Sequence, residues 1–184
     1  MILTDIELNA EIDAKRLQFD PPLVLKGPRP QLQTSTIDLR LGNGIREFKS
    51  PIRGVCIAVD PGDPQFDIDA FIAEYTIPKT ISDGEHYDLP PGAPLLAHTL
   101  ELVTMPAHLS GRVEGRSSLA RLGLTVHNTA PYIHPGYSDY ITLELFHHGT
   151  LPFRLRPGMR ICQLIVERVG SPPLEPYPGQ YRQG

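Results

Sequence analysis

Short runs rich in Val, Ile, Thr, Tyr and Phe recur along the chain after residue 35, and turn-forming residues separate them. Residues of these types favour strands over long helices. Because proline fixes φ and glycine tolerates unusual φ values, Pro-Gly pairs predict tight turns. The pattern predicts a mainly β fold, a sandwich or barrel. The expected strands cover residues 37–41, 55–59, 71–77, 95–105, 140–146 and 161–169, with Pro-Gly pairs at 61–62, 91–92, 135–136, 157–158 and 178–179.

A short N-terminal helix is predicted to precede these strands. Residues 4–7, Thr-Asp-Ile-Glu, fit a capping box, in which the Thr and Glu side chains satisfy free N–H groups of the first turn. Leu8 and Ile12 would share the apolar face, and Glu11 and Lys15 could pair along another face. A Pro-Pro pair lies beyond the expected end of the helix. The helix should cover one side or end of the sheet.

A second short helix is predicted over residues 117–122, where serines favour a helix start and Gly123 favours a helix end. Arg116 and Arg121 would place two guanidinium groups beside the exposed N–H groups of this helix. Such an arrangement suits a phosphate, which arginine binds with paired hydrogen bonds. The alternative is a capped surface helix with two solvated arginines.

Chain length and composition bound the remaining possibilities. A chain of 184 residues predicts one domain over residues 1–184, and the Pro- and Gly-rich stretch at 170–184 predicts a mobile tail. The net charge of −4 provides no general positive field, which argues against a polymeric nucleic-acid partner. Cys56 and Cys162 lie in apolar runs and are expected to be buried thiols rather than a disulfide. The absence of a signal-peptide pattern or of an apolar stretch of roughly 20 residues predicts a cytoplasmic protein without membrane spans.

Five segments, taken together, resemble the dCTP deaminase family of the dCTP deaminase and dUTPase superfamily. The most specific is EGRSSLARLGL at 114–124. STIDLRLG at 35–42 resembles the early strand of that family, and VHNTAPYIHPG at 126–136 resembles its nucleoside loop. ITLEL at 141–145 is similar to the catalytic strand, and RPGMRICQL at 156–164 to the late turn and strand. The order and spacing of the segments agree with the family from residue 35 onward.

The resemblance implies a homotrimer of distorted, jelly-roll-like β-sandwich subunits of the dUTPase-like, β-clip type, with active sites between subunits. It also implies a triphosphate bound with Mg²⁺, which the triphosphate itself would mainly hold, so that no protein metal ligand and no zinc are expected. The residues that it places at the nucleotide are Arg116, Ser117, Ser118, Leu119, Ala120, Arg121, His134, Thr142, Leu143, Glu144, Gln163, Tyr177, Gln180 and Gln183, the last three in a tail that closes over the substrate.

The resemblance matches Glu144 to the carboxylate that carries out deamination in the family, and the chemistry of cytosine deamination agrees with this role. Water must be activated to attack ring carbon 4, and the departing ammonia needs a proton. Zinc deaminases use a Cys/His metal site, but the sequence contains neither H-x-E nor P-C-x-x-C. Glu144 would therefore be the general base and then the acid, in a pocket dry enough to favour its protonated form near working pH. The resemblance implies that Ser117 and the Ala130 carbonyl position the water and that Arg121 stabilises charge; the alternative for Glu144 is an ordinary solvent-facing strand residue.

His134 departs from the family pattern, which commonly has Asp at this position to bond the deoxyribose 3′-hydroxyl. In dUTPases the matching Asp also activates the hydrolytic water. A neutral His can still bond a hydroxyl, so the change weakens the case for pyrophosphate release more than the case for deamination. His127, His147 and His148 could suggest a metal site, but adjacent strand residues point to opposite faces, and solvated or core histidines are the simpler explanation.

Three functional hypotheses remain at this stage. The leading one is dCTP deaminase, which converts dCTP and water to dUTP and ammonia. The second is a bifunctional enzyme that also hydrolyses dUTP to dUMP and pyrophosphate, or a plain dUTPase. The third is a non-catalytic, nucleotide-binding regulatory protein on the same fold.

Overall fold

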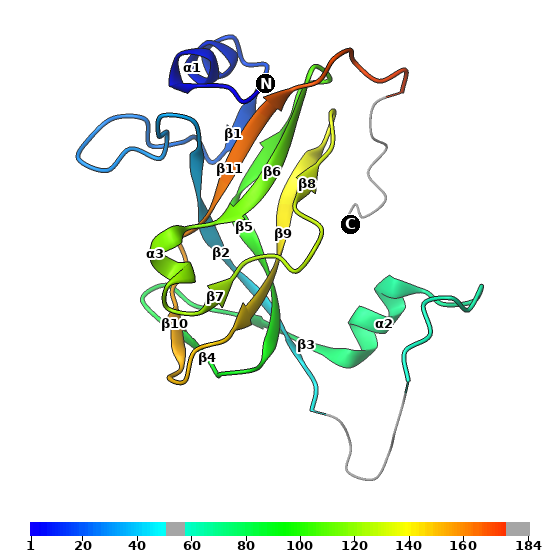
Figure 1. The fold of residues 1–184 in the computed structure, drawn as a ribbon. Helices are drawn as coiled ribbons and strands as arrows, with labels where there is room; N and C mark the ends of the chain where they lie inside the picture. The colour runs from blue at the N-terminus through cyan, green and yellow to red at the C-terminus, as the bar shows by residue number, and fades with distance from the viewer. Residues whose placement is uncertain (51–57, 176–184) are drawn as a thin grey trace.

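The protein folds around a curled antiparallel sheet, in a computed structural model that describes residues 1–50 and 58–175 (Figure 1). The strand order is β7-β9-β5-β2-β11-β6-β8, with β1 added beside β5 and β3 beside β2. β4 and β10 form a separate pair. The strands are β1 (Gln18–Asp20), β2 (Ile37–Phe48), β3 (Thr76–Thr80), β4 (Tyr87–Leu89), β5 (Pro94–Thr104), β6 (Leu109–Gly115), β7 (Leu124–Thr125), β8 (Tyr132–Ile133), β9 (Ser138–His147), β10 (Phe153–Leu155) and β11 (Arg160–Arg168).

Strand β2 joins the two layers of the curled sheet. One layer contains β11, β6 and β8, and the other contains β1, β3, β5, β7 and β9. Its first residues pair with β11, whereas its later residues pair with β5 and β3, and the register shifts between Leu41 and Ile45. Gly42 and Gly44 lie at this shift, and a Cβ there would come within 2.3 Å and 2.7 Å of the His98 ring. Since real Cβ atoms do not approach so closely, the two glycines allow the His98 ring of β5 to lie against β2.

The hydrophobic core lies between the two layers and confirms the mainly β prediction. Along β5 and β9, side chains alternate between buried and more exposed positions, as expected for strands with one face on the core. The strands predicted at 37–41, 95–105, 140–146 and 161–169 correspond to β2, β5, β9 and β11. The turns predicted at 91–92, 135–136 and 157–158 are also present, each with its glycine at positive φ.

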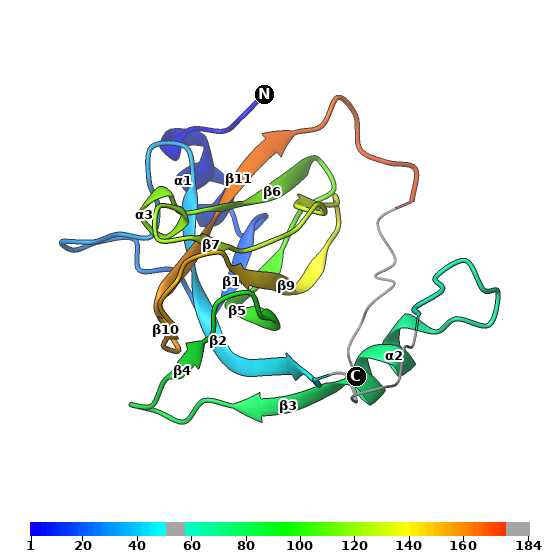
Figure 2. The ribbon, with the colours of Figure 1, turned by 60° about the horizontal axis from the view of Figure 1, so that its bottom comes forward.

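The strand predicted at 71–77 was wrong, because most of it belongs to helix α2 (Ile68–Tyr75). The Asp67 side chain caps this helix by accepting hydrogen bonds from the N–H groups of Asp69 and Ala70. No residue of α2 is buried, and the helix projects away from the sheet (Figures 1 and 2). Of the strand predicted at 55–59, residues 55–57 lie outside the described residues and 58–59 are irregular.

Helix α1 (Asp5–Asp13) confirms the predicted capping box, in which the Thr4 N–H donates to Glu7 Oε2 at 3.1 Å. Leu8 is fully buried, as the apolar pattern predicted. The predicted Glu11–Lys15 pair was wrong: Glu11 binds Arg16 Nε at 2.7 Å and His108 Nε2 at 3.1 Å. The helix has ended at Lys15, whose φ of 54° is outside the helical range, so that the i,i+4 geometry is lost.

This contact at Glu11 predicts a pH-dependent contribution to stability. The hydrogen bond from Arg16 lowers the pKa of Glu11 below its ordinary value of 4.5, against the opposing effect of burial. The stabilisation is therefore present above pH 4.5 and is lost as the pH falls through the lowered pKa. We expect Glu11→Gln to reduce the free energy of unfolding by about 1 kcal/mol at pH 7. Urea unfolding at several pH values should show the difference between variant and parent shrinking in acid; a constant difference would argue against this account.

The remaining local predictions concern α3 (Ser117–Ala120), Cys162 and membrane spans. The short helix is present, but its N-cap is Arg116 rather than a serine, and no side chain caps it. Gly123 ends the segment with φ +91°, and a Cβ there would lie 2.6 Å from the Gly149 nitrogen. Cys162 is a buried free thiol whose pKa is raised by burial, while Cys56 lies outside the described residues. No helix among the residues described is long and apolar enough to cross a membrane.

Candidate active site

The outer face of β9 carries the proposed catalytic carboxylate. Ile141, Leu143 and Leu145 point into the core, so the alternation of the strand directs Thr142 and Glu144 outward. Of the predicted site residues on this strand, Leu143 is completely buried. Its side chain is therefore part of the core, and only its backbone is available to a ligand.

The carboxylate of Glu144 is oriented from one side. Its Oε2 accepts a hydrogen bond from the Asn128 N–H at 2.9 Å, and the Glu144 N–H donates to the Val126 carbonyl at 3.1 Å. Oε1 has no hydrogen-bond partner among the described residues. One oxygen is thus fixed by the segment that follows β7, while the other is free to interact with water or a ligand.

The helix α3 segment is tied to the strand that carries Glu144. Gly123 accepts a hydrogen bond from the His148 N–H at 2.7 Å, and the next residues form β7, which pairs with the end of β9. Ser117, Ser118, Ala120 and Arg121 are exposed, Leu119 is half-buried, and Ala130 is exposed in the segment after β7. The Arg121 side chain makes no ion pair or hydrogen bond within the described part of the chain.

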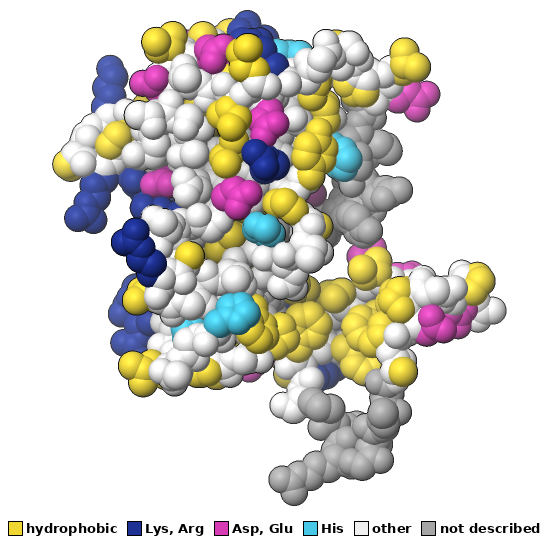
Figure 3. Space-filling view, in the orientation of Figure 1, with side chains coloured by type: hydrophobic (Ala, Val, Ile, Leu, Met, Phe, Trp, Pro, Cys, Tyr) yellow, Lys and Arg dark blue, Asp and Glu magenta, His cyan; other side chains and the backbone are white. Residues whose placement is uncertain are grey.

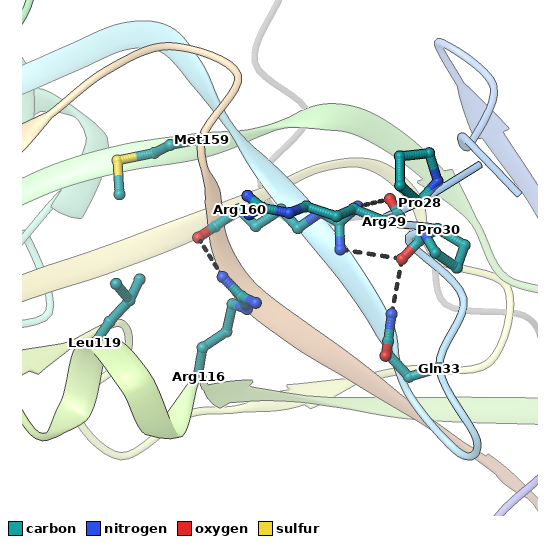
Figure 4. A pocket seen from close by; sticks show the side chains of 8 residues that line it. All are labelled: Pro28, Arg29, Pro30, Gln33, Arg116, Leu119, Met159 and Arg160. Carbon is teal, nitrogen blue, oxygen red and sulfur yellow. Dashed lines mark hydrogen bonds between the residues drawn. The ribbon is translucent and has the colours of Figure 1, made fainter. Parts of the chain in front are cut away.

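Arg116 is held differently from Arg121. Its Nε lies 3.3 Å from Asp38 Oδ1, and its Nη1 donates to the Arg160 carbonyl at 3.3 Å. Asp38 is buried on β2, and its other oxygen binds Arg160 Nη1 at 3.0 Å. A pocket of about 550 Å³ opens beside this cluster (Figure 4). It is lined by Pro28, Arg29, Pro30, Gln33, Arg116, Leu119, Met159 and Arg160.

Gln163 supports the same cluster through the backbone. Its Nε2 donates to the Gly115 carbonyl at 3.1 Å, directly before Arg116. On β11, Gln163 lies opposite Asp38 of β2 on one side and Glu114 of β6 on the other. In the single chain this side chain is therefore engaged with β6.

The other predicted positions are distributed around these clusters. His134 is exposed in the turn after β8, with its ring edge-on to Tyr132 at 4.9 Å. His147 is buried in the core and His148 lies against Phe146 on the opposite face, as the strand alternation predicted. Tyr177, Gln180 and Gln183 lie outside the described residues, as does most of the predicted tail at 170–184.

Sequence reasoning missed three residues that organise these clusters, and it missed His98 on the strand next to β9. Asp38 and Arg160 orient Arg116, and the backbone of Asn128 orients Glu144. His98 lies opposite Thr142 across β5 and β9, and its ring is 5.3 Å from that of Tyr140. Asp38 and Arg160 lie in segments that carried the family resemblance, but a role for their side chains depends on contacts distant in sequence.

Sequence relationships agree with this geometry. The profile of the dCTP deaminase-like family matches residues 2–169. The chain belongs to this family. It is similar to a protein of Mycobacterium avium named dCTP deaminase, dUMP-forming, with 42% identity over 187 residues that cover 100% of this chain and 88% of the relative. A protein of Parafrankia sp. with the same name is 40% identical over 177 residues, covering 96% and 81% of the two chains.

A solved structure of this family has the same fold. It is the 2′-deoxycytidine 5′-triphosphate deaminase of Agrobacterium tumefaciens, which superposes with a TM-score of 0.65 at 22% sequence identity. The match covers 91% of this chain and 48% of that chain, so this chain spans about half the length of the solved relative. The mainly β, dUTPase-like fold class predicted from the sequence is thereby confirmed.

Proposed function

We propose that this protein is an enzyme that removes the amino group of dCTP by hydrolysis, giving dUTP and ammonia. The observation that carries the proposal is the Glu144 carboxylate, which has one oxygen fixed by Asn128 and the other without a described partner. A base needs both features, because it must keep its orientation while it exchanges protons with a substrate or water. The names of the relatives support the same substrate class.

Glu144 would act twice in the reaction. It first removes a proton from water, whose oxygen bonds to ring carbon 4 while the electrons of the double bond between carbon 4 and ring nitrogen 3 move to nitrogen 3, giving a tetrahedral intermediate. It then passes that proton to the amino nitrogen, so that the bond between carbon 4 and the amino nitrogen breaks, ammonia leaves and the double bond to nitrogen 3 forms again. The hydroxyl proton that remains on oxygen moves to nitrogen 3, which gives the uracil carbonyl. Ser117 and the Ala130 carbonyl would orient the water, and Arg121 would stabilise charge at the reacting ring.

The triphosphate would lie against α3 and its arginines. Arg116 and Arg121 flank the helix and can donate paired hydrogen bonds to phosphate oxygens. Mg²⁺ bound with the triphosphate would neutralise part of its charge. Such an ion would be held mainly by phosphate oxygens, while Arg116 and Arg121 at the two ends of α3 would bind the same phosphates from the protein side. A zinc-independent reaction is supported by the sequence, which has neither of the two zinc-deaminase patterns.

A second candidate is a dUMP-forming enzyme that also releases pyrophosphate. The relatives at 40% and 42% identity are named as dUMP-forming, which favours this activity. His134 opposes it, since an imidazole replaces the carboxylate that the resemblance associates with activation of the second water. Deamination is common to both candidates.

We further propose a homotrimer with active sites between subunits. Helix α2 supports an assembly, because it is apolar yet has no buried residue in the single chain. Figure 3 shows apolar side chains gathered on this helix and on the adjoining surface, and Ile68 is among the exposed ones. Light scattering should give about three times the chain mass of 20.4 kDa; a monomer mass would contradict the trimer.

Product analysis tests the proposed activity. The protein is incubated separately with dCTP and with dUTP in the presence of Mg²⁺, and the nucleotides are resolved by ion-exchange chromatography. We expect dUTP to accumulate from dCTP. Formation of dUMP would support the second candidate, and tight binding without any product would support a regulatory protein and overturn deamination.

A further inference from the structure

The Arg116 side chain is restrained by the buried carboxylate of Asp38, which has no role in the reaction proposed above. Asp38 is 4% exposed, and its two oxygens contact two different guanidinium groups, those of Arg116 and Arg160. The Asp38 backbone is fixed as well, because its N–H donates to the Gln31 carbonyl and its carbonyl accepts from Gln31 Nε2, both at 2.8 Å. The carboxylate therefore has a fixed position between two cations.

The contacts of Arg116 leave one terminal nitrogen of its guanidinium without a described partner. Nε faces Asp38 and Nη1 donates to the Arg160 carbonyl, whereas Nη2 has no hydrogen-bond partner in the described chain. Arg160 is more fully engaged, since it binds Asp38 and donates to the carbonyls of Pro30 and Arg29 (Figure 4). Both terminal nitrogens of Arg160 are therefore bonded, whereas the Nη2 group of Arg116 keeps both of its N–H donors for a ligand.

We propose that Asp38 is a positioning residue for the triphosphate site, which holds Arg116 so that its free Nη2 donors face the phosphates. The inference rests on the proposed function in one respect, namely that Arg116 binds the triphosphate. An unrestrained arginine loses side-chain entropy when it binds a ligand. A guanidinium already fixed by Asp38 and by the Arg160 carbonyl loses less, so that phosphate binds more tightly.

Two effects of Asp38 oppose each other. Its negative charge makes the electrostatic potential at the phosphate site less positive. Removal of this charge would therefore, by itself, strengthen the binding of an anion. Without the carboxylate, however, two guanidinium groups face each other without their shared counterion, and Arg116 loses the contact at Nε. Asparagine cannot replace the carboxylate, because its amide NH₂ would oppose at least one of the two arginines. We infer that the loss of orientation is the larger effect.

A double-mutant cycle tests whether Asp38 acts through Arg116. Binding of inorganic tripolyphosphate and of dCTP is measured by calorimetry for the full chain and for Asp38→Asn, Arg116→Gln and the double variant. Asp38→Asn should weaken binding of both ligands about tenfold, and it should have almost no further effect once Arg116 is Gln. Tighter binding by Asp38→Asn, or additive effects in the double variant, would overturn the proposal.

Two controls separate this role from a purely structural one. Asp88→Asn removes a carboxylate that binds Arg154 at 2.8 Å elsewhere in the fold, and it should leave triphosphate affinity unchanged. Arg160→Gln releases the side-chain contacts to the Arg29 and Pro30 carbonyls in the loop that lines the pocket, while Arg116 is retained. If Arg160→Gln weakens triphosphate binding as much as Asp38→Asn does, and if the effects of Asp38→Asn and Arg116→Gln are additive, the effect belongs to the loop and the proposal is wrong.

A spectroscopic measurement on the unaltered protein keeps the inference testable if Asp38→Asn does not fold. A restrained Arg116 should give a Nε–H resonance that exchanges slowly with water before tripolyphosphate is added. Rapid exchange of that proton in the free protein would overturn the proposal. Because affinity and exchange are measured without turnover, failure of this inference is distinguishable from failure of deamination, which product analysis reports.

Discussion

Glu144→Gln should abolish deamination, with kcat reduced by about 10²–10⁴-fold or more. Glutamine preserves the size of the side chain and can still accept the Asn128 N–H through its carbonyl oxygen. It cannot take a proton from water or return one to the amino group. Binding of dCTP should change little, so that the loss appears in kcat rather than in the dissociation constant. Steady-state kinetics together with calorimetry of the variant would measure both quantities.

Glu167→Gln is a suitable control for this experiment. Glu167 also lies on a strand, β11, and its carboxylate binds Arg112 at 2.8 Å. This variant should retain the parental kcat because it has no part in the proposed proton transfers. Normal turnover by Glu144→Gln would contradict the mechanism, whatever the affinity for dCTP.

Glu101→Ala is expected to destabilise the fold by about 3–5 kcal/mol. The Glu101 side chain is completely buried and binds Arg40 Nε at 2.6 Å, the Arg40 N–H at 2.9 Å and Gln31 Nε2 at 2.8 Å. Removing the carboxylate leaves these donors unsatisfied and leaves the Arg40 charge without its partner. The free energy of unfolding from urea titration would measure the effect.

Glu47→Ala provides the exposed counterpart of this change. Glu47 pairs with Lys79 between β2 and β3, where both side chains are at least 35% exposed. Solvent screens such a pair, so its loss should cost less than about 1 kcal/mol. Equal destabilisation by the two variants would show that burial is not what makes the Glu101 network important.

The sequence predicted the sheet more successfully than the helices. β9 and β11 were recognisable because they contain several β-branched or aromatic residues, and a Pro-Gly turn precedes each of β5, β9 and β11. α2 was missed since residues 71–77 have strand-like composition, and the Asp67 cap that starts the helix lies before that run. The predicted partner of Glu11 was also wrong. Helix α1 ends at Asp13, and Lys15, the residue after the C-cap Ala14, has a positive φ that takes it out of the helical geometry.

The candidate site was predictable only in its linear motifs. Glu144 and the α3 segment occur in blocks that resemble a known family, and simple alternation predicts that Glu144 points outward. The Arg116–Asp38–Arg160 cluster depends on the pairing of β2, β6 and β11, which brings distant parts of the chain together. Nothing local to Asp38 indicates that its carboxylate is buried between two arginines.

The most direct test of the central claim is to quantify ammonia and pyrimidine nucleotides in one reaction of the purified protein with dCTP and Mg²⁺. Deamination by Glu144 predicts one ammonia for each uracil nucleotide formed, and no ammonia with the Glu144→Gln variant. Unchanged dCTP and no ammonia from a folded protein that binds the nucleotide would contradict the account.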